Sequence, residues 1–112
     1  MILKKVIVQS PQPPGPFNLN TDADPIDDDG IFNLNWDISE GAMNYKVYQH
    51  SSYITVINTS LTPLLVETTL LSLSLSGYTD GTYYFIVVAY NNYGQTISNY
   101  VKVIVQIPHP FS

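Results

Sequence analysis

The residues best suited to chemistry are carboxylates gathered in one short segment. Asp22, Asp24, Asp27, Asp28 and Asp29 supply five of the nine acidic residues of this 112-residue chain. Carboxylates this close repel one another, and a hard cation with six to eight oxygen ligands relieves that repulsion. The segment therefore predicts a calcium site, with Asp22, Asp24, Asp27 and Asp29 as its ligands.

The same segment has an interpretation without a metal. Pro25 and Ile26 interrupt the ligand spacing of an EF-hand loop, and no glutamate closes the site. Asp29-Gly30 is a common turn dipeptide, so the segment also fits a solvated loop. Calcium is the one cofactor that the sequence suggests, and both interpretations stay open.

Other reactive side chains are too few and too scattered for catalysis. The two histidines are His50 and His109, and His109 lies between prolines. The chain has no cysteine, no Gly-x-Ser-x-Gly elbow, no His-Glu-x-x-His pair and no phosphate-binding loop. Glu40 and Glu67 have no evident partner. We expect a protein that is not an enzyme.

The charge balance argues against several partners. The net charge is −5, with four lysines and no arginine, whereas a nucleic-acid binder needs clustered cations. We expect no nucleic-acid partner. The apolar start, Met1 to Val8, is too short for a signal peptide or a spanning helix. We therefore expect no membrane insertion by this segment, and an export signal and anchor outside the chain.

Short runs that alternate between apolar and polar residues predict an all-β chain, because no stretch carries a capped helical repeat. Turn dipeptides such as Asp80-Gly81 separate the runs. The expected strands cover residues 17–20, 31–38, 44–50, 64–67, 71–75, 82–91 and 98–106. Phe32, Leu34, Trp36 and Ile38 share one face, and Pro63 favours a sheet edge for the strand beside it.

A repeated pentapeptide suggests how the chain is divided. Lys5-Val6-Ile7-Val8-Gln9 recurs as Lys102-Val103-Ile104-Val105-Gln106, and prolines follow both. The repeat indicates tandem modules; chance similarity of two β-rich segments is the alternative. We expect an N-terminal strand with a proline-rich linker (1–15), which would be the tail of a preceding repeat, a domain (16–107) and a proline-containing tail (108–112).

The order of the predicted strands resembles the fibronectin type III family. Trp36 ends one strand, Tyr45-Lys46-Val47-Tyr48 lies in the next, and Leu75-Ser76-Gly77-Tyr78-Thr79-Asp80-Gly81-Thr82-Tyr83 leads into the strongest strand. The resemblance spans about residues 16–105. It implies a seven-stranded Greek-key, immunoglobulin-like sandwich without activity of its own, here with an extra N-terminal strand. It also makes Tyr83 the corner tyrosine, whose hydroxyl binds nearby backbone.

Further details resemble tandem repeats of archaeal surface proteins. These are Asp28-Asp29-Gly30 before the tryptophan strand and the stretch from Ser51 to Leu61 after the third strand. In such a sandwich the large aromatic Trp36 fills the centre of the core. The predicted core residues are Trp36, Tyr45, Val47, Leu73, Tyr83, Phe85 and Val87.

The opposite side of the strongest strand predicts a contact face. If Tyr83 and Phe85 point inward, the residues between and after them point outward, where a sandwich is normally polar. The predicted contact face consists of Tyr48, Tyr84, Ile86, Val88, Tyr90, Tyr100 and Ile104. An apolar patch of this kind is typical of a protein interface, although β-branched residues also simply favour strands.

Two more features fit an exported protein that contacts others. Lys4 to Gln9 has no sheet of its own within this domain and is a candidate for strand addition to a neighbour. Asn58-Thr59-Ser60 is a sequon for N-glycosylation at Asn58.

Taken together, the sequence predicts an extracellular or cell-surface module for adhesion, spacing or assembly. Its expected partners are proteins, either neighbouring modules or copies of itself. One alternative is a carbohydrate-binding module that stacks sugars on Tyr48, Tyr84 and Tyr90. Another is an accessory domain of a secreted enzyme.

Overall fold

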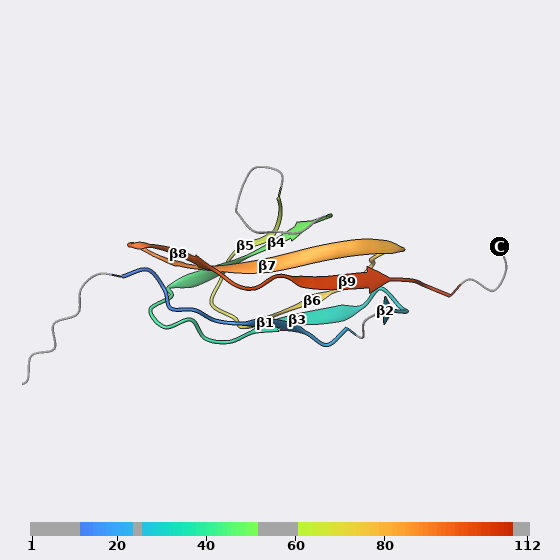
Figure 1. Cartoon of the computed structure of the whole chain (residues 1–112), viewed down its shortest axis with the longest axis horizontal. Helices are drawn as coiled ribbons and strands as arrows, with labels where there is room; N and C mark the ends of the chain where they lie inside the picture. Colours follow the sequence, from blue (N-terminus) through green and yellow to red (C-terminus); the bar gives the residue numbers. More distant parts are fainter. Residues whose placement is uncertain (1–11, 24–25, 52–60, 109–112) are drawn as a thin grey trace, which may run out of the picture.

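Two β-sheets face each other in the computed structural model, which describes residues 12–23, 26–51 and 61–108 (Figure 1). The smaller sheet has the order β1-β3-β6 and the larger one the order β2-β9-β7-β4-β5, with β8 paired to β7. The strands are β1 (Leu19–Thr21), β2 (Ile26–Asp27), β3 (Phe32–Trp36), β4 (Asn44–His50), β5 (Thr62–Thr68), β6 (Ser72–Leu75), β7 (Gly81–Asn91), β8 (Gly94–Ile97) and β9 (Val101–Val105). The predicted all-β sandwich is confirmed.

In the described residues, nine strand segments correspond to the seven expected strands, because β2 is an addition and the last expected strand is divided into β8 and β9. β8 and β9 together form the last strand, which begins earlier than residue 98 and breaks at residues 98–100. β2 lies inside the acidic segment, which fitted a loop on the sequence alone. There the chain has left β1 of the smaller sheet and pairs in parallel with β9 of the other sheet, Ile26 opposite Ile104. No helix in the described ranges is long and apolar enough to span a membrane.

The core lies between the sheets and is rich in aromatic rings. Trp36, Tyr45, Val47, Phe85 and Val87 are buried there. Leu73 and Tyr83, the remaining predicted core residues, are half-buried and pack against them. The Trp36 and Tyr45 ring centroids lie 6.0 Å apart. Alternation in β3, β4 and β7 therefore places the predicted side chains between the sheets.

One residue of the predicted core face is outside the core. Ile38 is 72% exposed, although it continues the alternation of Phe32, Leu34 and Trp36. The reason is that β3 ends at Trp36. Beyond that residue the sheet no longer imposes a two-residue period on side-chain direction.

Two local contacts fix the connection before β7. Tyr83 Oη donates to Thr79 O at 2.8 Å, as expected of a corner tyrosine. Gly30 has φ 70°, and a Cβ there would lie 2.2 Å from Tyr78 O. Tyr78 N in turn donates to Gly30 O at 3.3 Å. The turn before β3 is thus packed directly onto the connection that leads into β7.

Candidate contact surfaces

The predicted contact face does lie on the outer side of the larger sheet, but its centre is not open to solvent. Ile86, Val88 and Tyr84 are 0%, 1% and 7% exposed. Together with Leu61, which precedes β5, they form a second buried cluster, and Ile97 of β8 packs against it. The expectation of an open patch at these three residues is therefore wrong, because the chain covers them itself.

The other members of that face are partly accessible. Tyr48, Tyr90 and Ile104 are half-buried, and Tyr100 is 41% exposed. The Tyr100 ring contacts the Tyr84 ring edge to face at 5.8 Å. These side chains border the second cluster rather than forming one continuous surface with it.

A small polar and aromatic group remains at one end of this face. Lys46 Nζ lies 4.7 Å from the centroid of the Tyr90 ring, a cation–π distance. Desolvation raises the pKa of Tyr90, and the charges of Glu67 and Tyr48 add to the shift. Lys46, Tyr48, Glu67 and Tyr90 therefore lie near one another, on β4, β5 and β7. We call these four residues the Tyr90 group.

The acidic segment uses its carboxylates to hold the fold. Asp22 Oδ1 and Oδ2 accept from Asn33 N and Nδ2, both at 2.7 Å. These hydrogen bonds lower the pKa of Asp22. The buried carboxylate of Asp27 accepts from Gly30 N at 2.6 Å, and Asp29 Oδ1 accepts from Ile31 N at 2.9 Å.

Three of the four proposed calcium ligands thus accept hydrogen bonds from backbone N–H groups through their carboxylates. The fourth, Asp24, lies outside the described residues. Among described side chains, no group of three or more metal-ligating residues comes together. Calcium binding stays a prediction. The sequon at Asn58, the segment Lys4 to Gln9 and His109 also lie outside the described residues.

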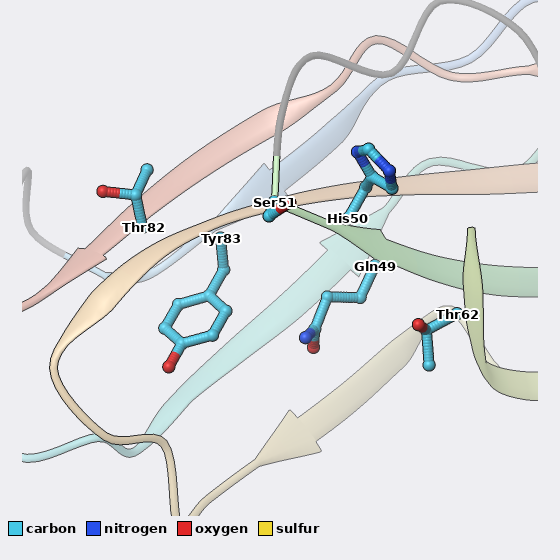
Figure 2. Close-up of a pocket in the computed structure, with 6 residues that line it drawn as sticks. All are labelled: Gln49, His50, Ser51, Thr62, Thr82 and Tyr83. Atoms are coloured by element: carbon cyan, nitrogen blue, oxygen red, sulfur yellow. The ribbon is translucent and has the colours of Figure 1, made fainter. Parts of the chain in front are cut away.

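A shallow hollow of about 260 Å³ lies where β4, β5 and β7 approach one another near Ser51 (Figure 2). Its lining residues are Gln49, His50, Ser51, Thr62, Thr82 and Tyr83. Figure 2 shows Gln49 and Tyr83 on one side of the strands and His50 on the other. The Tyr78 hydroxyl donates to Gln49 Oε1, and the Tyr83 hydroxyl donates to Thr79 O. The Tyr83 hydroxyl and the Gln49 side-chain oxygen of this lining are thus engaged in hydrogen bonds within the fold.

The opposite end of the sandwich is built by the proline-rich lead, residues 12–16. Gly15 N donates to Glu40 O at 2.8 Å, and Ser39 Oγ donates to Gly15 O at 2.6 Å. The Thr96 hydroxyl donates to Pro14 O, and Asn91 Nδ2 donates to Gln12 O at 2.9 Å. Residues expected to be a linker are therefore hydrogen-bonded to the connection between β3 and β4 and to strands β7 and β8.

Exposed apolar side chains gather at this same end. The connections at residues 37–43, 69–71 and 92–93 all lie there, because β3, β5 and β7 end there and β4 begins there. They carry Ile38, Met43, Leu70 and Tyr93, which are 72%, 56%, 66% and 62% exposed. We call these four residues the loop pole. In Figure 1 the three connections that carry it lie toward the end at which the blue lead enters.

The loop pole was missed in the sequence because alternation describes strands and not connections. A signal was nevertheless present. Met43 lies two residues after Gly41 and Tyr93 directly before Gly94, so both are large apolar residues where solvent-exposed turns are expected.

Comparison with known proteins supports the fold. No family model matches the chain, and no curated protein matches it. A solved Fn3-like protein from Clostridium thermocellum has a TM-score of 0.56 and 21% identity, covering 93% of this chain and 100% of its own. The protein FN3tt has a TM-score of 0.51 and 21% identity, and the match covers 86% of this chain and 95% of FN3tt.

A larger enzyme contains a similar region. The pectate lyase PelI from Erwinia chrysanthemi, solved in complex with tetragalacturonic acid, has a TM-score of 0.60 and 16% identity over 79% of this chain. The match covers 28% of the lyase chain. At these identities the likeness shows the fold alone, and that fold is an Fn3-like sandwich.

Proposed function

We propose that this protein is a non-catalytic sandwich module that holds neighbouring modules of an extracellular or surface protein against one another. The observation that carries the proposal is the loop pole. Four large apolar side chains from three separate connections lie exposed at one end, and exposed apolar patches favour protein contact.

The position of the proline-rich lead, residues 12–16, indicates which module would contact the loop pole. Hydrogen bonds to Gln12, Pro14 and Gly15 hold the lead at the loop pole. A module preceding residue 12 would therefore be placed next to Ile38, Met43 and Tyr93. The repeated pentapeptide supports this arrangement, since residues 5–9 would be the last strand of that preceding copy. The resemblance to tandem repeats of archaeal surface proteins, seen in the sequence, is part of this proposal because such repeats also follow one another in a chain.

A tandem chain tests the proposal. Residues 1–106 are joined directly to residues 10–112 of a second copy, so that Lys102–Gln106 of the first replaces Lys5–Gln9 of the second. NMR relaxation should show the two modules tumbling as one body. Ile38→Ser, Met43→Ser and Tyr93→Ser together in the second copy should let the two modules tumble independently. The control, Ile26→Ser in the second copy, changes a residue that is 50% exposed at the other end of that module and should leave them tumbling as one body. Independent tumbling of the unsubstituted tandem would refute the proposal.

A second candidate is an accessory module that binds carbohydrate. Two observations favour it: the similarity of this chain to part of a pectate lyase solved with tetragalacturonic acid, and the Tyr90 group, which combines aromatic rings with a cation and a carboxylate. Tyr84 is buried and is no longer part of a stacking platform. Titration with oligogalacturonate should perturb Tyr90 and Tyr48 signals, and Tyr90→Ala should abolish binding while Tyr93→Ala preserves it. Unchanged spectra would exclude this candidate.

A further inference from the structure

The exposed sheet edges of this protein are not equally protected. β5 is an edge strand that carries Pro63 and Glu67, and its register with β4 shifts twice. Proline, charge and irregular pairing all discourage the addition of another strand. At the edge of β1, the Asn99 amide bonds both Leu19 N and Leu19 O. β2 is two residues long and lies in the acidic segment.

β6 has none of these protections. Its sequence is Ser72-Leu73-Ser74-Leu75, without charge or proline, and its register with β3 is unbroken from Phe32↔Leu75 to Asn35↔Ser72. In the described part of the chain it pairs with β3 alone. Leu73 and Leu75 are only half-buried. An added strand would shield both leucines.

The direction of the unpaired backbone groups follows from Asn33. Asn33 N donates to Asp22 Oδ1, and Asn33 O accepts from the Thr21 hydroxyl at 2.8 Å. Both groups of Asn33 therefore point toward β1. In an antiparallel ladder the opposite residue, Ser74, then turns its N–H and C=O away from β3. The same alternation turns the backbone groups of Ser72 to the open edge.

We propose that the open edge of β6 accepts residues 5–9 of a second copy of this chain as an added β-strand. Residues 5–9 are identical in sequence to residues 102–106. Four of those five residues lie in β9, where Val103 and Val105 are buried. The pentapeptide is thus a strand former in this fold. The place beside β7 is already filled by β9, which leaves β6 as the acceptor.

Charge favours the same pairing. Lys4 and Lys5 lie at the start of the donor, and the chain as a whole carries −5. The donor is therefore the cationic part of an acidic chain, and its local attraction to acidic side chains of a second copy acts against the net repulsion between the two copies. The contact is head-to-tail, and repetition gives rings or filaments. The inference rests on the proposed role in protein contact, uses a surface other than the loop pole, and applies where residues 5–9 are not already the last strand of a preceding copy.

Two single substitutions in the full chain test the pairing by complementation. Ile7→Pro disables the donor, and Ser74→Pro removes the outward N–H of the acceptor. Light scattering should show assemblies larger than one chain for the unsubstituted protein and a single chain of 12.5 kDa for each variant. An equimolar mixture should give a dimer of twice that mass, because each variant retains what the other lacks.

Controls separate this pairing from folding and from the loop pole. Ile7→Val and Ser74→Thr keep the backbone donors and should assemble normally. Ser74→Lys serves as the acceptor variant if Ser74→Pro does not fold. The Ile38, Met43 and Tyr93 serine variant should assemble normally, so a failed loop pole would leave this result intact. A monomeric unsubstituted chain, or a mixture that stays monomeric, would overturn the proposal.

Discussion

The side-chain amide of Asn99 forms hydrogen bonds with both the N–H and the C=O of Leu19, eighty positions earlier in the chain. Leu19 N donates to Asn99 Oδ1 at 2.8 Å, and Asn99 Nδ2 donates to Leu19 O at 2.9 Å. Asn99 lies in the break between β8 and β9, whereas Leu19 begins β1 of the other sheet. One amide therefore ties the two sheets together and occupies the edge of β1 as a strand would.

Asn99→Ala should destabilise the domain by about 1–2 kcal/mol, because both backbone groups of Leu19 lose their partner. Urea unfolding should show a lower midpoint with an unchanged slope. Asn20→Ala, an exposed asparagine of the same strand β1, is the control and should have a much smaller effect. Equal effects of the two substitutions would mean that the bridge contributes little.

Gly30→Ala should be among the most damaging single changes, costing more than about 2 kcal/mol, since it combines a left-handed backbone with a backbone clash. A Cβ at Gly30 would lie 2.2 Å from Tyr78 O. Gly77 has a similar φ of 75° but no atom within 4 Å of such a Cβ. Gly77→Ala should therefore cost only the conformational term, about 1 kcal/mol. Thermal unfolding of both variants measures the difference, and equal losses would exclude the clash.

Tyr83→Phe should cost about 1 kcal/mol, because it removes the hydrogen bond to Thr79 O and keeps the ring. The Tyr83 ring lies 4.8 Å from that of Tyr78, so packing is preserved. Tyr93→Phe, at a 62% exposed position, is the matched control and should leave the unfolding midpoint unchanged. A Tyr83→Phe protein as stable as the parent would argue against a corner role.

Acid should weaken the fold partly through Asp22. Hydrogen bonds from Asn33 hold the pKa of this carboxyl below its usual value of 3.8. A lowered pKa in the folded state stabilises the fold above the unfolded value, and that contribution is lost as the pH falls through the folded value. Asp22→Asn should flatten the decline in stability from neutral pH to pH about 2. Urea midpoints across this range provide the check, and parallel curves for parent and variant would contradict it.

Alternation predicted the strands well because it is a local property. Trp36, Tyr45 and Phe85 lie in the core for the reason expected: each occupies the inward position of a half-buried strand. β2 was missed because two residues carry no period, and its partner β9 lies almost eighty positions away. Ile38 was misplaced because alternation does not indicate where a strand leaves its sheet.

The contact face shows a different limit of sequence patterns. Alternation correctly placed Ile86 and Val88 on the outer side of β7, but it carries no information on what covers that side. Leu61, just before β5, completes a second cluster there. The loop pole and the Asn99 bridge depend on connections brought together by the fold, which a single sequence does not reveal.

The most direct measurement of the contact role uses Met43 as a probe. The chain has two methionines, Met1 and Met43, so methyl labelling of methionine gives one signal from the loop pole. In the tandem chain, the Met43 methyl of the second copy should be shielded from a soluble paramagnetic agent, while that of the first copy should relax as in the single module. Equal paramagnetic relaxation of both Met43 methyl groups would contradict the account.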